Sequence, residues 1–185
     1  MLNKLNMPEK MENADIRIMK VVPDMCDDLF EAIESSREFL RQYLFWVDGV
    51  KNPADEAASI RMFLENWDKG DSFIYAVYEK NSGRLAGTID AHAINRNDHV
   101  AYIGYWLRKD QTGHGFISKA LAPLEKILFD QGIHRIVIMC EVSNLPSAAV
   151  AERNHYVFEG IAKERIWSYG EFHDAKIYAK LASAL

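Results

Sequence analysis

The chain has 185 residues, of which 49% are hydrophobic, and a formal net charge of −5 at pH 7. This length and composition predict a globular protein that folds as one domain, residues 1–185, with a substantial core. The acidic balance excludes the basic footprint of a general nucleic-acid binder, so no nucleic-acid partner is expected.

The cysteine content and the N-terminal segment indicate the compartment. Cys26 and Cys140 are too few for a disulfide framework, which favours a reducing environment. Residues 1–12 lack the apolar core of a signal peptide, and no apolar run approaches the ~20 residues that span a bilayer. We therefore expect a soluble, cytoplasmic protein with no membrane partner.

The first third of the chain predicts an arm, a strand and two helices. Residues 1–14 are expected to form a loose arm, followed by a strand over Ile16–Val21. A helix capped by Asp24 should extend to Leu40. The aromatic segment Tyr43–Val47 has two interpretations, core packing or the wall of a binding pocket. A second helix is predicted from Asn52-Pro53 to Gly70 or Asp71.

Three antiparallel strands should follow, because alternating apolar runs are separated by turn sequences. The turns are Asn81-Ser82-Gly83 and Asn95–Asp98, and the strands are predicted over 73–78, 85–93 and 99–107.

A glycine turn then joins the third strand to a helix. Gly113-His114-Gly115 precedes a helical apolar pattern that starts at Phe116 and ends at Gln131-Gly132. Unpaired amides at a helix N-terminus suit a phosphate, although such glycines also occur as plain turn residues. The turn matches neither a Walker loop nor the dinucleotide fingerprint, which would need glycine at Ser118.

The last third predicts a crossover and a hairpin. Pro123 should kink the preceding helix. A strand over Arg135–Val142 should run parallel to the strand before the helix. Asn144 is expected to cap a short helix, and the hairpin should comprise residues 157–167 and 172–181.

Several segments together resemble the GNAT superfamily of N-acetyltransferases. They are Ala101–Leu107, Gln111–Gly115, Asn144–Gly160 and Gly170–Tyr178. Within it, the chain looks like the RimJ/RimL-type group of ribosomal-protein-serine N-terminal acetyltransferases. The resemblance implies an α/β (α+β) GNAT fold with a central mixed, mostly antiparallel sheet of about seven strands and four flanking helices. A splayed pair of parallel strands would hold the cofactor.

The resemblance also implies acetyl-CoA as co-substrate. Its pyrophosphate would rest on the amides of Thr112, Gly113, His114, Gly115 and Phe116. Its pantetheine arm would contact Tyr105, Leu107 and Asn144.

The turn departs from the superfamily pattern. Asp110 or Thr112, depending on the register, stands where the family has Gln or Arg. Backbone amides rather than side chains should therefore dominate the phosphate contacts. Arg108, Lys109 and Lys119 could offset the coenzyme charge, or could form a solvated rim.

The expected reaction is direct attack of a neutral amine on a thioester. An α-amine, with a pKa of ~7.7–8.0, needs less help than a lysine at ~10.4. A strand amide near Tyr105–Leu107 would polarise the carbonyl. By resemblance, Ser147 would donate a hydrogen bond to the leaving sulfur, unless it only bonds locally. Tyr156 is the fallback donor, unless it belongs to the core.

The remaining chemistry is less defined by the sequence. Glu141 is a candidate general base, although a strand carboxylate is usually solvated. Cys140 has no flanking histidine to activate it, so a covalent acyl-enzyme is not favoured. The 6 histidines show no metal-ligand spacing, and no metal site is expected.

We therefore predict an acetyltransferase acting on the N-terminal α-amine of a protein, by implication ribosomal. Two alternatives stay open, acetylation of a small amine such as an amino acid, polyamine or antibiotic, and a non-catalytic sensor that binds coenzyme A. A homodimer through the exposed sheet or the C-terminal tail is also considered.

Overall fold

One mixed sheet organises the structure, a computed structural model that describes residues 2–184. Its strand order is β1-β2-β3-β4-β5-β6-β8-β7, and all neighbours are antiparallel except β5 and β6. The parallel crossover expected around the glycine turn is thereby confirmed. The strands are β1 Lys10–Glu12, β2 Ile16–Lys20, β3 Phe73–Glu79, β4 Leu85–Asn95, β5 Val100–Leu107, β6 Arg135–Glu141, β7 Val157–Ser168 and β8 Glu171–Leu181.

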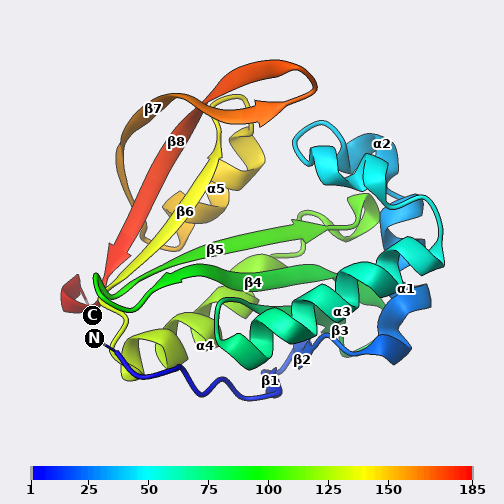
Figure 1. Ribbon diagram of the computed structural model, residues 1–185, viewed down its shortest axis with the longest axis horizontal. Coiled ribbons are helices and arrows are strands. Elements are labelled where there is room, and N and C mark those ends of the chain that lie inside the picture. The colour runs from blue at the N-terminus through cyan, green and yellow to red at the C-terminus, as the bar shows by residue number, and fades with distance from the viewer. Residues whose placement is uncertain (1, 185) are drawn as a thin grey trace.

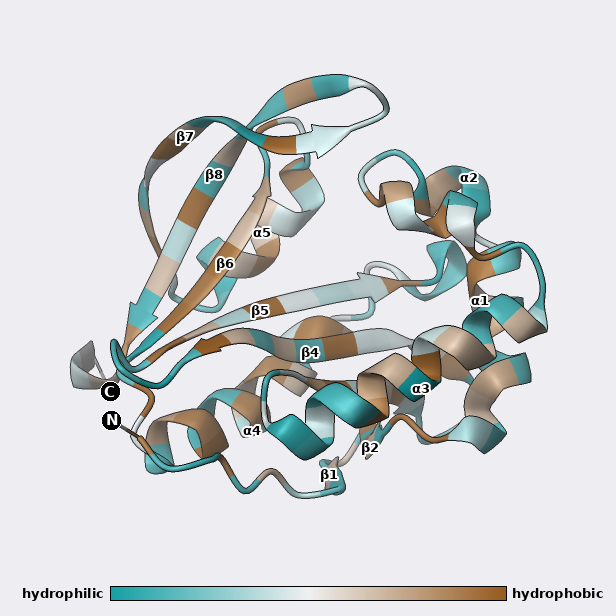
Figure 2. Ribbon diagram, in the orientation of Figure 1, coloured by the Kyte–Doolittle hydropathy of each residue, from teal (hydrophilic) through white to brown (hydrophobic). Residues whose placement is uncertain are grey.

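Helices cover both faces of the sheet (Figure 1). They are α1 Cys26–Glu34, α2 Arg37–Leu40, α3 Pro53–Lys69, α4 Phe116–Asp130 and α5 Leu145–Arg153. Side chains alternate between the faces of a strand, so in β3 Ala76 and Tyr78 pack with α1 and α3. Tyr75 and Val77 belong to the core cluster that contains α4. Figure 2 shows that α3 and α4 carry both hydrophobic and hydrophilic residues, as amphipathic helices do.

The ends of α3 lie where the sequence predicts them. The Asn52 side chain accepts hydrogen bonds from the amides of Ala54 and Asp55, and Pro53 occupies the first turn. Gly70 adopts a left-handed conformation with φ of 75° and ends the helix. These local signals are strong because each satisfies backbone groups that a helix end leaves unpaired.

The helix predicted from Asp24 to Leu40 is wrong in two respects. A 3-10 turn over Pro23–Met25 precedes α1, so Asp24 is not its cap. The chain also breaks at Ser35-Ser36 before α2, which makes five helices instead of four in the described residues. The Ser36 hydroxyl accepts a hydrogen bond from the Lys109 amide at 3.0 Å. This tertiary contact holds the break beside the end of β5.

The N-terminal arm is not loose, which corrects a second expectation. Residues 10–12 form β1, an eighth strand, and Leu5, Met7 and Met11 are buried.

Pro123 lies within the continuous helix α4 and has no N–H to donate to the Lys119 carbonyl. Asn13 Nδ2 donates to that carbonyl instead, at 3.1 Å. The arm thus satisfies the acceptor that the proline leaves free, while the kink itself stays a prediction.

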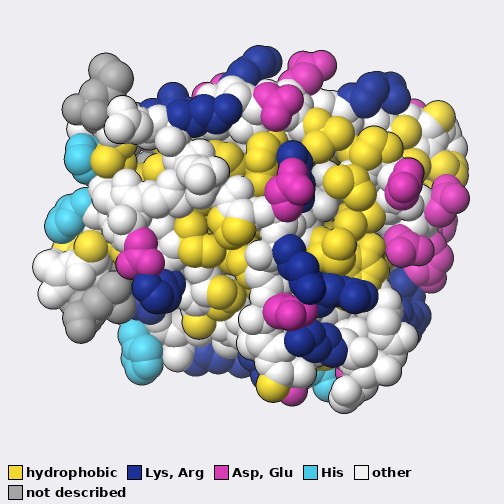
Figure 3. All heavy atoms as spheres, turned by 90° about the horizontal axis from the view of Figure 1, so that it is seen from below, with side chains coloured by type: hydrophobic (Ala, Val, Ile, Leu, Met, Phe, Trp, Pro, Cys, Tyr) yellow, Lys and Arg dark blue, Asp and Glu magenta, His cyan; other side chains and the backbone are white. Residues whose placement is uncertain are grey.

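The molecular surface is of mixed charge on the face drawn in Figure 3, where acidic and basic side chains lie among one another. None of the helices within residues 2–184 has the length and apolar character needed to cross a membrane.

Candidate active site

The parallel strands β5 and β6 separate after a short paired segment. Their pairing runs from Val100↔Arg135 to Tyr102↔Val137 and then stops. Beyond that point β5 continues beside β4 and β6 continues beside β8, and Figure 1 shows the two diverging from one corner of the sheet. The splayed pair that the resemblance implied is therefore present.

The splay leaves backbone groups of β5 without a strand partner. The Arg108 amide donates to the Ala86 carbonyl of β4 at 2.8 Å. Amides point to alternate sides of a strand, so those of Tyr105 and Leu107 point away from β4 and into the gap. An extended amide-containing chain could pair with them there, as a further strand would.

The glycine turn at the end of this gap exposes a run of amides. Gly113 and Gly115 have φ of 82° and 74°, a conformation that favours glycine. Within residues 2–184, no amide from 113 to 118 donates to a backbone carbonyl. These amides lie at the positive end of the α4 dipole. The arrangement fits a pyrophosphate, and backbone rather than side chains would hold it, as expected.

Replacing Gly115 with alanine should weaken the binding of coenzyme A by about 5- to 30-fold. Left-handed backbone costs a non-glycine residue about 1–2 kcal/mol, and relief of that strain would turn the amides away. Isothermal titration calorimetry with coenzyme A checks this.

Gly83→Ala is the matched control, because Gly83 also has a positive φ, of 69°, and open space at its Cβ position. It lies in the β3–β4 turn, so its affinity for coenzyme A should equal that of the wild type. Equal losses in the two variants would contradict the assignment.

A cavity of about 400 Å³ joins the glycine turn to the splay, and we call it the turn cavity. It brings together most of the side chains predicted to bind the coenzyme. Its lining includes Tyr105, Leu107, Thr112, Gly113, Gly115, Phe116, Asn144 and Ser147. His114 does not line it, since its exposed ring stacks on Phe116 with 5.6 Å between the centroids.

Ser147 and Tyr105 meet in the turn cavity. Their hydroxyl oxygens lie 3.0 Å apart, and Asn144 Oδ1 accepts a hydrogen bond from the Ser147 amide at 3.1 Å. Burial raises the pKa of Tyr105 well above its ordinary value, so its hydroxyl stays protonated. Burial also raises the pKa of Cys140. The thiol is therefore protonated and unsuited to act as a nucleophile.

Two predicted catalytic residues line neither of the cavities described here. Glu141 receives a hydrogen bond from the Ser143 hydroxyl and lies 3.7 Å from His173 Nδ1. Tyr156 is 4% exposed and packs in the core, where burial and nearby Glu125 raise its pKa. Both residues are close in sequence to the splayed strands, but the Glu141 side chain contacts Ser143 and His173, and that of Tyr156 lies in the core.

Two of the basic side chains expected to offset the charge of the coenzyme form ion pairs within the protein instead. Arg108 is 2% exposed and bonds Glu31, and Lys119 pairs with Asp15 at 2.9 Å. Arg153 of α5, which the sequence did not single out, lines the turn cavity. It is the basic side chain of that lining.

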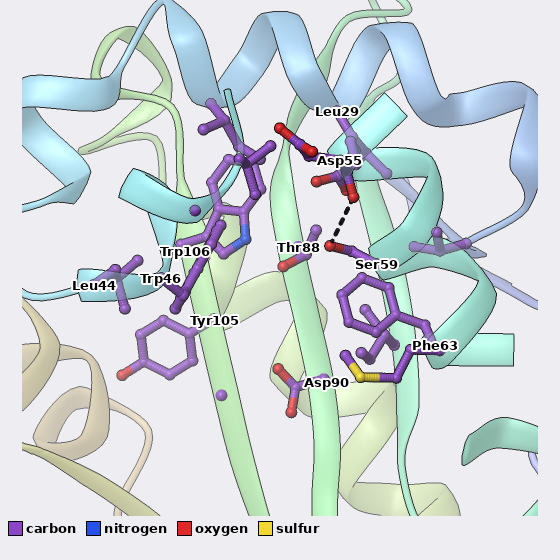
Figure 4. Close-up of a pocket in the computed structure, with 18 residues that line it drawn as sticks. Leu29, Leu44, Trp46, Asp55, Ser59, Phe63, Thr88, Asp90, Tyr105 and Trp106 are labelled. Atoms are coloured by element: carbon purple, nitrogen blue, oxygen red, sulfur yellow. Dashed lines mark hydrogen bonds between the residues drawn. The ribbon is translucent and has the colours of Figure 1, made fainter. Parts of the chain in front are cut away.

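A second cavity, of about 510 Å³, lies between α3 and strands β3, β4 and β5, and we call it the α3 cavity. Figure 4 shows Trp46 and Trp106 on one side and Ser59 and Phe63 on the other, with Asp90 near its floor. Apart from Tyr105, sequence reasoning identified none of its polar residues. The others are Asp55, Glu56, Ser59, Thr88 and Asp90.

The two cavities share a wall made of Leu44, Tyr105 and Trp106. Tyr43 donates to the Ser143 carbonyl at 3.2 Å and so connects the segment after α2 to the loop after β6. Leu44 and Trp46 both line the α3 cavity. Val47 is fully buried in a core cluster, against which Leu44 and Trp46 also pack. Each of the two interpretations of Tyr43–Val47 therefore holds for part of the segment.

Comparison with known proteins agrees with this geometry. The acetyltransferase (GNAT) domain family matches residues 16–157. A ribosomal-protein-serine acetyltransferase of Escherichia coli is 29% identical, over 83% of this chain and 85% of its own length. A Bacillus subtilis protein described as a putative ribosomal N-acetyltransferase, YdaF, is 27% identical over 91% and 92% of the two chains.

Solved structures are also similar over almost the whole chain. RimL, described as a ribosomal alpha-N-protein acetyltransferase in complex with coenzyme A, has a TM-score of 0.88 and 28% identity, covering 94% of this chain and 98% of its own. The microcin self-immunity acetyltransferase MccE, in complex with acetyl-CoA and AMP, has a TM-score of 0.90 and 25% identity, covering 95% and 97%. The chain belongs to the GNAT acetyltransferase family and is an acetyl-CoA-dependent N-acetyltransferase.

Proposed function

We propose that this enzyme acetylates the N-terminal α-amine of a protein, and that the protein is ribosomal. The observation that carries the proposal is the pair of cavities that meet at Tyr105 and Trp106. One lies at an anion-binding turn and the other contains carboxylates, so a coenzyme and an amine can approach the same strand from opposite sides. The names of the Escherichia coli and Bacillus subtilis relatives support a ribosomal acceptor.

The residues have distinct roles in this proposal. Acetyl-CoA supplies an activated thioester carbonyl. The amides of the glycine turn hold its pyrophosphate, and those of Tyr105 and Leu107 hold the pantetheine arm and polarise the carbonyl. The Tyr105 hydroxyl donates to the Ser147 carbonyl at 3.2 Å and also lies 3.0 Å from Ser147 Oγ, so it holds this serine in place. In the proposal, the Ser147 hydroxyl turns its hydrogen to the departing sulfur. A thiol pKa of ~8.5 makes this hydrogen bond sufficient without a strong acid.

A small amine is the second candidate acceptor, and the α3 cavity favours it. Leu44 and Trp46 form part of the wall, and the cavity of about 510 Å³ is mostly apolar with three carboxylates. Such an enclosure can hold a whole small molecule. A peptide would insert only its first residues.

Thiol release from acetyl-CoA distinguishes the two acceptors. We would scan peptides with free N-terminal Ser, Ala and Met, together with spermidine and an aminoglycoside. Turnover with a serine-starting peptide is the expected result. Turnover with small amines alone would replace the protein acceptor by the second candidate. Tight acetyl-CoA binding with no turnover of any acceptor would contradict both and return the sensor alternative.

Two expectations about organisation stay predictions. We propose that residues 1–185 act as one N-acetyltransferase domain and that the chain forms a homodimer. The supporting observation for the dimer is a group of exposed apolar side chains on β7 and β8, namely Val157, Phe158, Ile161, Trp167 and Phe172.

A further inference from the structure

Glu56 is a buried acid in the wall of the α3 cavity. It lies in the first turn of α3 and is 4% exposed. Among residues 2–184, no side chain or backbone amide forms a hydrogen bond or an ion pair with its carboxylate. Carboxylates of largely buried residues are normally paired, because an unpaired charge with restricted access to water is costly. The position of Glu56 on a cavity indicates that its partner comes from outside the chain.

The other two acids of the α3 cavity already have partners. Asp55 Oδ2 accepts hydrogen bonds from the Lys51 amide and from Asn52 Nδ2, each at 2.9 Å. Asp90 pairs with His92 Nδ1. Glu56 is therefore the uncommitted carboxylate of the three.

The rest of the cavity lining suits a cation. It includes no Lys, Arg or His, and its aromatic faces come from Trp46, Phe63 and Trp106. Aromatic faces attract organic cations, and most strongly where water is excluded. Burial and the nearby carboxylates of Asp27 and Glu56 raise the pKa of Cys26 of α1, so this neighbouring thiol stays neutral and adds no positive charge. No basic group of the lining competes with an incoming ammonium group.

We propose that Glu56 is the residue of the α3 cavity that binds an alkylammonium group of the acetyl acceptor. The inference rests on the proposed function, in which the acceptor enters through this cavity. The shared ligand chemistry is a primary or secondary ammonium, which a peptide N-terminus or a small polyamine can supply. Glu56 holds the acceptor in its ammonium form as it enters. Before transfer at the shared wall near Tyr105 and Ser147, the attacking nitrogen must release a proton and leave Glu56 as a neutral amine.

The raised pKa of Glu56 agrees with a role in binding an ammonium group. Burial raises the pKa of Glu56 to about 7 in the protein alone. Asp55 and Asp90, which line the same cavity, add only negative charge around it, and Cys26 on α1 has a raised pKa and stays a neutral thiol. A bound ammonium would lower that pKa again, so binding should weaken as the pH falls below 7.

Calorimetry without acetyl-CoA tests recognition apart from catalysis. The ligands are a serine-starting peptide, the same peptide with an acetylated N-terminus, and spermidine. The wild type should bind at least one of the two ammonium ligands 10-fold or more tightly than Glu56→Gln does. The acetylated peptide should bind both proteins equally. The comparison of peptide with spermidine identifies the source of the ammonium group.

Glu65→Gln is the matched control, since Glu65 lies on the same helix, is exposed and does not line the cavity. It removes the same charge and should leave binding unchanged. In turnover, Glu56→Gln should raise the acceptor KM at least 10-fold with a smaller change in kcat and none in the KM for acetyl-CoA.

Equal affinity of the wild type and Glu56→Gln for both ammonium ligands would overturn the assignment, and so would the absence of binding to the wild type. If a peptide is turned over with the same KM by both proteins, the proposed function stands and only the role of Glu56 is removed.

Discussion

Replacing Ser147 with alanine should lower kcat by about 10- to 100-fold and leave the affinity for acetyl-CoA nearly unchanged. A positioned donor of this kind typically contributes at least that much to a rate. The Ser147 hydroxyl lies 3.0 Å from that of Tyr105, and Asn144 fixes its backbone through the amide. The expected loss is at the lower end of the range because a thiolate is a good leaving group. Steady-state kinetics and calorimetry with coenzyme A measure the two quantities.

The serine two residues after β6 provides the control. Ser143→Ala removes a hydroxyl that bonds Glu141 outside the turn cavity, and it should keep the wild-type kcat. Tyr105→Phe keeps Ser147 but removes the partner that orients it, so a smaller loss is expected. A wild-type kcat in Ser147→Ala would mean that this hydroxyl only bonds within the first turn of α5.

The fold could be predicted from the sequence because its signals are local and agree with one another. The runs at 73–78, 85–93 and 99–107 each became a strand of nearly those bounds. The glycine turn between an apolar strand and an apolar helix implied a crossover, and the crossover fixed one parallel pair. Resemblance added the splay and the cofactor, which no periodicity reveals.

The N-terminal arm escaped prediction because its order depends on residues far along the chain. Half of residues 1–14 are polar, and the segment shows no sustained period. Leu5, Met7 and Met11 are nevertheless buried in the main core, and Asn13 bonds the Lys119 carbonyl. The sequence shows that Pro123 removes one backbone hydrogen bond from α4. It does not show that Asn13, more than 100 residues away, supplies a replacement donor for the Lys119 carbonyl.

Glu56 was missed for a different reason. An acid in the first turn of a helix is ordinary, since the helix dipole favours it there. A clue was nevertheless present, because Glu56 is spaced 4 and 11 residues from the buried Ile60 and Trp67. An acid on the apolar face of an amphipathic helix is unexpected. Only the packing of α1 and β4 around α3 shows that this face includes a cavity.

Glu56→Gln should stabilise the protein at pH 8 by about 2 kcal/mol and have almost no effect at pH 5. Glutamate has an ordinary pKa of 4.5, which burial raises to about 7 in the folded protein. The folded state therefore holds this proton more tightly than the unfolded state does. The resulting stabilisation is complete below pH 4.5 and is lost as the pH rises to 7. Glutamine resembles the protonated acid and avoids that loss. The magnitude is reduced because the α3 cavity is not fully enclosed.

Urea unfolding at the two pH values measures the difference in the free energy of unfolding, with Glu65→Gln as the exposed control. Lower stability of Glu56→Gln at pH 8 would show that the carboxylate has a stabilising partner within the protein, and would remove the reason for an external one. An ammonium ligand should stabilise the wild type more than the variant at pH 8, because binding follows the folded state. Glu56 would then destabilise the free enzyme, and a bound ammonium ligand would remove that cost. Recognition of the acceptor would explain the presence of this acid, because it does not stabilise the fold by itself.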